Sequence, residues 1–186
     1  MLLYHVSFDR VKRFAPRVPQ NISPGEDTTT PRICLSDSVI RCINARARQA
    51  WPIYNAMQAG VPIGFYVYEF QTDEFPPNAL LYPEDIRKRG VIDATFWHEY
   101  WLLKPPRAVS ETFFVVREAT YQEDCAPSKW ASSLSLEPST DPTVHLAERF
   151  ARQASKKLNE SISTDIIYTE FAEELRPLWE MSKQHG

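Results

Sequence analysis

Apolar and polar residues alternate in several short segments of this chain, and each such segment predicts a β-strand. The first strands are expected over residues 1–6 and 32–35. A run rich in aromatic and β-branched residues predicts a third strand over 63–70, and similar runs predict strands over 96–103 and 111–119. Along 63–70, alternation puts Phe65, Val67 and Glu69 on one face and Tyr66, Tyr68 and Phe70 on the other.

Helical periodicity is strongest near the C-terminus, over about 142–158 and 165–181. Earlier in the chain, Ser36-Asp37-Ser38 supplies oxygens that can cap a helix running to about residue 50, and a turn of helix is expected near 83–89. Strands in the middle and helices at the end predict an α+β fold rather than repeated βαβ units.

This pattern also suggests a domain organisation. We expect one domain over 1–125, a Ser/Pro-rich linker over 126–140, and a helical extension over 141–186. The extension has enough apolar residues to pack on the domain or on another chain, including a second copy in a homodimer.

Composition narrows the class of protein. The 186 residues are 43% hydrophobic and 12% aromatic, which is enough for a packed core. The net charge of −3 argues against a general nucleic-acid coat. The apolar runs are too short to span a membrane, and the N-terminus becomes polar too early for a secretory signal. A cytoplasmic location is therefore expected.

Glycine and cysteine exclude several kinds of site. Five scattered glycines form neither a dinucleotide-binding GxGxxG motif nor a phosphate-binding P-loop. The three cysteines, Cys34, Cys42 and Cys125, form no CxxC pair, so no metal site is expected. Cys34 and Cys42 are interpreted as small apolar residues of the core, as suits a reducing compartment.

The segment FWHEYWLL contains the main candidate for chemistry. Glu99 lies there among Trp97, Tyr100 and Trp101, and a carboxylate in such surroundings is costly unless it faces a cleft or a partner. Alternation along a strand would put Glu99 on the face of both tryptophans, and His98 on the other. The alternative is an edge-strand glutamate that points into solvent.

The order of these segments resembles the ADP-ribosyltransferase superfamily. The succession is YHVS on the first strand, ICLSDS leading into a helix, GFYVYEF, and then HEYWLLKPP. The layout is most similar to compact bacterial and phage members, including rifampin and anti-defence ADP-ribosyltransferases. The resemblance covers roughly residues 2–118 and implies split, mixed or antiparallel sheets with flanking helices.

The resemblance also implies roles for individual residues. NAD would be the substrate, without a metal, and Glu99 would stabilise the oxocarbenium-like nicotinamide ribose. His5 of the Tyr4-His5 pair would hold the adenosine-side ribose, and Arg32 would pair with the pyrophosphate. The residue that lines the nicotinamide pocket in the second motif would be Ser36, Tyr66 or Tyr68. The acceptor, whether protein, nucleic acid or small molecule, is left open.

Two departures from the family pattern keep a second function open. Arginine-modifying members carry an acidic or amide residue two positions before the catalytic glutamate, where this chain has Trp97, so arginine is not favoured as the acceptor. The second motif also lacks its usual tyrosine. A catalytically inactive binding or inhibitory module of the same frame is the alternative, and an RNA 2′-phosphotransferase relative is less favoured because no basic cluster adjoins His5.

Overall fold

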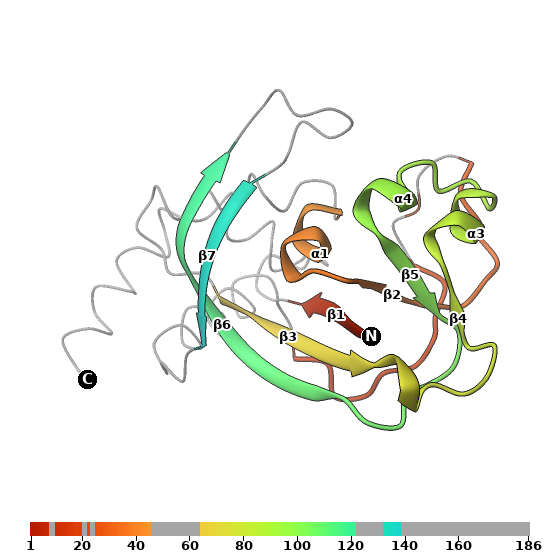
Figure 1. The fold of residues 1–186 in the computed structure, drawn as a ribbon, viewed down its shortest axis with the longest axis horizontal. Helices are drawn as coiled ribbons and strands as arrows, with labels where there is room; N and C mark the ends of the chain where they lie inside the picture. Colours follow the sequence, from red (N-terminus) through yellow and green to blue (C-terminus); the bar gives the residue numbers. More distant parts are fainter. Residues whose placement is uncertain (8–9, 20–21, 23–24, 46–63, 122–131, 139–186) are drawn as a thin grey trace, which may run out of the picture. The chain divides into compact units, whose positions relative to one another are not determined.

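The computed structural model describes residues 1–7, 10–19, 22, 25–45, 64–121 and 132–138 (Figure 1). The chain divides into two compact units. The first comprises Met1–Ala45 and Val67–Glu111, and the second comprises Arg46–Tyr66 and Thr112–Gly186. The two predicted C-terminal helices and Cys125 lie outside the described residues.

The first unit is built on antiparallel strands. β1 (Leu2–Ser7), β2 (Ile33–Ser36), β4 (Leu80–Leu81) and β5 (Glu99–Leu102) lie in the order β4-β5-β2-β1, and β3 (Gly64–Gln71) continues the sheet beyond β1. The β1–β2, β2–β5 and β4–β5 pairs are antiparallel. Segments distant in the sequence thus become neighbours, with β2 between β1 and β5.

Short helices pack beside these strands (Figure 1). α1 (Val39–Ala45) contacts β1 and β2, whereas α3 (Pro83–Arg87) and α4 (Ala94–Trp97) contact β5. A short 3₁₀ helix, η1 (Thr72–Glu74), follows β3. Trp101 of β5 is fully buried in a cluster formed with α3, α4 and their connection; the other buried members are Ile86, Val91 and Ala94.

Aromatic side chains form a second packed group around β1 and β3. The Phe14 ring meets Tyr68 edge-on at 4.9 Å between centroids and Phe70 at 5.1 Å. The Val11 N–H donates to the Tyr68 hydroxyl at 2.7 Å, which also holds the segment after β1 in place. Edge-to-face aromatic contacts of this kind stabilise beyond their buried area.

The second unit contains the first residues of β3, most of β6 (Ser110–Tyr121), and β7 (Ser132–Pro138). β6 and β7 pair antiparallel, with an irregularity between Val116 and Glu118. Gly64 allows a close approach, since a Cβ there would lie 2.3 Å from the Phe113 ring. The Phe113 ring lies 5.0 Å from that of Tyr66.

The α+β class and the positions of most strands are confirmed, but two local predictions are wrong. Residues 96–103 do not form one strand, because α4 ends at Trp97, His98 turns in the left-handed conformation, and β5 begins at Glu99. Ser36 is the last residue of β2, and α1 begins at Val39, directly after Ser38. β7 lies inside the segment 126–140 that was expected to be a linker. Within the described residues, the helix predicted to run to residue 50 is seen as α1, ending at Ala45.

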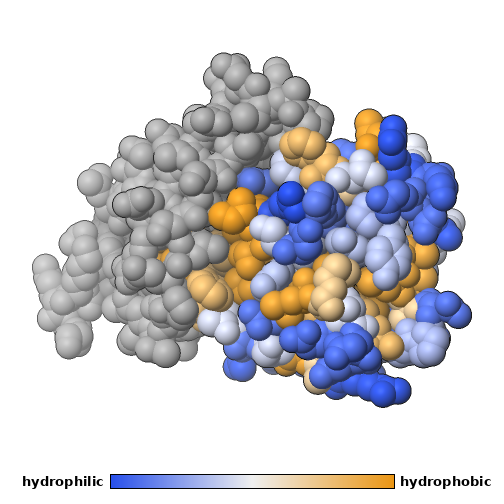
Figure 2. Space-filling model, viewed as in Figure 1, coloured by the Kyte–Doolittle hydropathy of each residue, from blue (hydrophilic) through white to orange (hydrophobic). Residues whose placement is uncertain are grey.

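The surface seen in Figure 2 mixes hydrophilic and hydrophobic residues over the described part of this face. The most exposed large apolar side chains are those of Ile92, Met1, Tyr82 and Phe96. None of the helices described is long and apolar enough to cross a membrane.

Candidate functional site

Three of the predicted site residues lie in register across adjacent strands. Tyr4 of β1 is directly opposite Ser36 of β2, and Ser36 is directly opposite Glu99 of β5. Directly opposed residues of antiparallel strands project from the same face of the sheet. The sheet therefore brings together Tyr4, Ser36 and Glu99, although each is more than 30 residues from the next along the chain.

Ser36 holds the middle position by a bond of its own. Its hydroxyl is buried, with the residue 3% exposed, and donates to the Trp97 carbonyl oxygen at 2.8 Å. This bond joins the end of β2 to the end of α4 and fixes the point at which the chain turns into β5. The Ser36 side chain is thus part of the framework beside Glu99.

The Glu99 carboxylate is oriented by Trp101, two residues further along the same face. The Trp101 indole N–H donates to Glu99 Oε1 at 2.7 Å. Burial raises the pKa of Glu99, although hydrogen bonds from the Trp101 indole and the Cys34 thiol, and the positive charge of Arg32, act in the opposite direction. Burial also raises the pKa of Cys34, so its thiol remains a proton donor to Glu99.

Arg32 lies on the other side of Trp101. Its guanidinium carbon is 3.8 Å from the centre of the Trp101 ring, a cation–π contact. The residue is only 4% exposed, and its Nη1 donates to the carbonyl oxygens of Asp27 at 2.9 Å and Thr30 at 3.1 Å. Among the buried side-chain nitrogen and oxygen atoms of the described residues, its Nε is the one for which no hydrogen bond is found. Arg32 therefore presents a positive charge to the buried cluster around Glu99.

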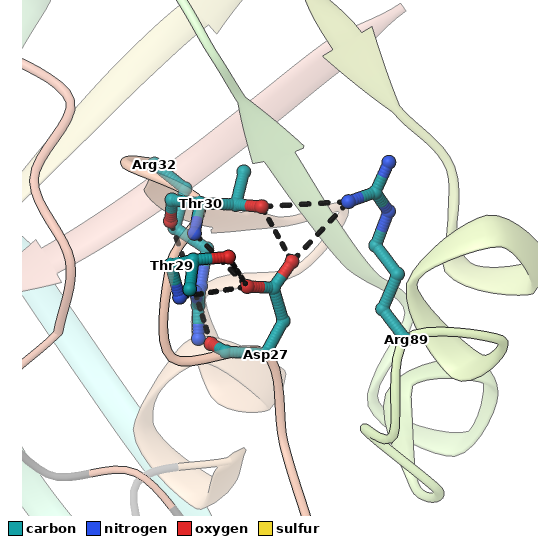
Figure 3. A network of polar contacts seen from close by, with 5 residues as sticks. All are labelled: Asp27, Thr29, Thr30, Arg32 and Arg89. Carbon is teal, nitrogen blue, oxygen red and sulfur yellow. Dashed lines mark hydrogen bonds and ion pairs between the residues drawn. The ribbon is translucent and has the colours of Figure 1, made fainter.

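A tight loop before β2 fixes Arg32 (Figure 3). The Asp27 carboxylate accepts from the backbone N–H groups of Thr29 and Thr30, at 2.8 and 2.9 Å, and from both of their hydroxyls. These hydrogen bonds hold the pKa of Asp27 well below its usual range, and the bond from the Thr30 hydroxyl contributes most. Arg89, just after α3, pairs with Asp27 at 3.2 Å.

A glycine contact brings this loop against the end of α3. Gly90 has φ = 97° and lies so close to Gly25 that a Cβ at position 90 would be 2.0 Å from the Gly25 carbonyl oxygen. A side chain at position 90 would therefore displace the loop that carries Asp27 and Arg32.

The remaining predicted site residues lie elsewhere. His5 follows Tyr4, so alternation puts its side chain on the face opposite Glu99. Its Nδ1 is 2.9 Å from the Cys34 carbonyl oxygen, and its ring contacts those of Phe14 and Tyr68. Tyr68 belongs to this aromatic group. Tyr66 belongs to the second unit.

Tyr4 is the first-strand residue that shares the face of Glu99. Burial is the largest cause that raises its pKa, and the negative charge of Glu69 on β3 adds to it. The Tyr4 phenol therefore keeps its proton at neutral pH and can donate a hydrogen bond. Its carbonyl oxygen accepts the Cys42 thiol of α1 at 3.2 Å.

A second polar cluster, which the sequence did not predict as a site, adjoins the Ser36–Glu99 pair. Asp37 follows Ser36 and His98 precedes Glu99; Asp37 Oδ2 lies 2.6 Å from His98 Nδ1. Asp37 Oδ1 accepts from Arg41 at 2.7 Å. Burial opposes ionisation of Asp37, but the hydrogen bonds from His98 and Arg41 outweigh it and lower its pKa. The sequence signal was present in ICLSDS and FWHEYW, but only the pairing of β2 with β5 joins these motifs.

Comparisons with known proteins give no family for this chain. No family model, no curated protein and no solved structure matches it. Among the described residues, no group of histidine, cysteine and acidic side chains is arranged to hold a metal ion.

Proposed function

We propose that this protein is a mono-ADP-ribosyltransferase that uses NAD as its substrate and Glu99 as its catalytic carboxylate. One observation carries the proposal: Tyr4, Ser36 and Glu99 are in register on the adjacent strands β1, β2 and β5. These strands carry three of the four segments on which the sequence resemblance to this superfamily depends.

The proposed chemistry requires a fixed negative charge beside the nicotinamide ribose. Departure of nicotinamide leaves oxocarbenium character at the anomeric carbon, as in glycoside hydrolysis. An ionised Glu99 stabilises this charge and accepts a hydrogen bond from a ribose hydroxyl. A preorganised group of this kind typically contributes about 3–4 kcal/mol to the transition state.

The contacts of Glu99 suit this role. Trp101 holds one carboxylate oxygen at 2.7 Å, and the Trp101 ring is itself held by the Arg32 guanidinium at 3.8 Å. Arg32 cannot swing away, because two backbone carbonyls of its own loop bind it. This chain of contacts fixes the direction of the carboxylate before NAD binds, and that is the condition for electrostatic catalysis. In this proposal Arg32 acts on Glu99 rather than on the pyrophosphate.

In this proposal the Tyr4-His5 pair of β1 has other roles than those the resemblance implied. Tyr4, rather than His5, shares the face of Glu99 and would contact NAD there, with its protonated phenol as a hydrogen-bond donor. His5 would support the strand from the other face through the Cys34 carbonyl oxygen. Ser36, which is bonded to the Trp97 carbonyl oxygen, would hold the end of β2 beside Glu99.

The experiment is to incubate the purified full chain with NAD and measure the release of nicotinamide. Glu99→Gln keeps the size of the side chain and an oxygen for the Trp101 N–H, but removes the negative charge. We expect release to fall by about 10²–10³-fold with little loss of NAD affinity. The matched control is Glu111→Gln, which removes a strand carboxylate paired with Arg10 and should leave release unchanged. Equal release by wild type and a folded Glu99→Gln variant rules out the mechanism.

A second candidate function is a catalytically inactive NAD-binding or inhibitory module of the same frame. Two observations favour it: burial raises the pKa of Glu99, which works against ionisation, and His5 lies on the other face of the sheet. Calorimetric titration with NAD separates the candidates. Binding without nicotinamide release supports the module, and release that depends on Glu99 supports the enzyme.

A further inference from the structure

Next to the Ser36–Glu99 pair lies a histidine held in an unusual backbone conformation. His98 has φ = 50° and ψ = 53°, the left-handed region that non-glycine residues rarely adopt. It is one of two such non-glycine residues in the described part of the chain, the other being Asn78 with φ = 57°. Strained residues of this kind persist where the surrounding structure fixes them, and they are concentrated at functional sites.

The His98 ring has two polar neighbours at its Nδ1 atom. Nδ1 is 2.6 Å from Asp37 Oδ2 and 2.7 Å from Arg41 Nη1. Arg41 Nη1 also donates to Asp37 Oδ1, and we assign the proton of the His98–Asp37 contact to Nδ1 because an ionised carboxylate oxygen can only accept. A neutral imidazole that donates through Nδ1 has Nε2 as its proton-accepting nitrogen. A carboxylate–histidine pair of this kind orients a general base.

The position of this pair in the fold connects it with Glu99. Asp37 and His98 are the next residues beyond the Ser36–Glu99 pair, at the same end of β2 and β5. Trp97, two residues before Glu99, is buried, and its indole N–H donates to Asp93 at 3.1 Å, so it is not available to an acceptor. The His98 side chain, in contrast, is 42% exposed.

We propose that His98, held by Asp37, is the general base that activates the acceptor, and that the acceptor is a neutral hydroxyl group which approaches at this end of β5. This inference rests on the proposed function. Because Asp37 offsets the charge of Arg41, the choice of acceptor rests on the base itself. An imidazole cannot deprotonate a guanidinium, whose pKa is far above its own, whereas a hydroxyl loses its proton as its oxygen bonds to carbon.

The step balances without any further reactant. The acceptor oxygen forms a bond to the anomeric carbon of the ribose as the bond from that carbon to the nicotinamide nitrogen breaks. The electron pair of the broken bond neutralises the pyridinium, and neutral nicotinamide leaves. The hydroxyl proton passes to His98 Nε2 and then to water.

The test uses the strain at position 98. Glycine adopts the left-handed conformation without strain, so His98→Gly should fold while it removes the imidazole. With NAD and ethanol as the probe hydroxyl, we expect nicotinamide release and formation of ethyl ADP-riboside to fall by about 10²–10⁴-fold, the usual range for a general base. Added imidazole should restore part of the rate, and NAD affinity should be unchanged.

The matched control is Asn78→Gly, which relieves the same backbone conformation away from this cluster and should leave the rate unchanged. Asp37→Asn should lower the rate, but imidazole should not restore it, because the His98 ring still fills the position. Wild-type activity that depends on Glu99 but is equal in His98→Gly would overturn the base and leave the proposed function intact. Absence of Glu99-dependent release in wild type would overturn both.

Discussion

The carboxylates of Glu99 and Asp37 lie near each other at one end of β2 and β5, yet their pKa values shift in opposite directions. Glu99 lies at the start of β5, and burial raises its pKa. Asp37 follows β2, where hydrogen bonds from His98 and Arg41 outweigh the effect of burial and lower its pKa. The two neighbouring carboxylates are therefore stabilised as anions to different degrees.

The difference lies in the donors that each carboxylate receives. Glu99 has an indole N–H and a thiol, both neutral, with the charge of Arg32 acting through Trp101. Asp37 has a guanidinium at 2.7 Å and an imidazole at 2.6 Å, in a more open position. Bonds from charged donors are stronger than bonds from neutral ones, so Asp37 is stabilised as an anion and Glu99 much less so.

The largest expected effect, after loss of Glu99 itself, comes from removing its indole donor. Trp101→Phe keeps a ring for Arg32 but deletes the N–H, which should raise the pKa of Glu99 further. A hydrogen bond to a charged group is worth about 1.5 kcal/mol or more, so the acidic limb of the pH profile of nicotinamide release should move to higher pH by about one unit. The measurement is the pH profile of release.

Trp97→Phe is the matched control for this variant. It also deletes an indole N–H that donates to a carboxylate, but the partner is Asp93. Its pH profile should superimpose on that of wild type. A parallel loss of rate at every pH in Trp101→Phe would mean that the indole supports packing rather than the ionisation of Glu99.

A smaller effect should appear in stability, with opposite signs for the two carboxylates. At pH 7, Asp37→Asn should lower the free energy of unfolding by about 1 kcal/mol, a value reduced by the partial exposure of its partners. Glu99→Gln should leave it unchanged or raise it, because a buried charge is replaced by a neutral group that still accepts from Trp101. Urea unfolding monitored by tryptophan fluorescence gives both values, and equal losses in the two variants would contradict the comparison.

The smallest effect is the dependence of stability on pH. The pKa of Asp37 is lowered on folding, so its contribution is present above its unfolded pKa and is lost as the pH falls through the folded value. The pKa of Glu99 is raised on folding, so its contribution is present below its unfolded pKa and is lost as the pH rises through the folded value. Between about pH 4 and neutral pH, Glu99→Gln should therefore flatten a decline in stability.

Asp37→Asn should have its effect on the acid side of this range, where it should reduce the loss of stability seen in wild type. Urea unfolding at a series of pH values separates the two. If the unfolding free energies of both variants ran parallel to that of wild type at all pH values, the pKa of each carboxylate would be the same in the folded and unfolded states.

Sequence patterns predicted the strands well where one face is apolar and the other is not. The prediction of a single strand over 96–103 was wrong because a run of aromatic and aliphatic residues fits a strand and a buried helix equally well. The turn at His98 depends on the Asp37 contact and on packing of Trp97, and neither can be read from the local pattern. The contact of Ser36 could not be predicted from the local pattern either, since its hydroxyl binds the Trp97 carbonyl oxygen, 61 residues away.

By itself, the sequence determined the α+β class, the strands that form the sheet, and the presence of an unusual glutamate among aromatic residues, because these follow from local periodicity and composition. The tertiary structure decided which residues surround that glutamate. The register of β2 between β1 and β5 selects Tyr4 over His5, brings Arg32 and Trp101 together, and joins Asp37 to His98. Register is a long-range property, fixed by the packing of the whole sheet rather than by any single segment.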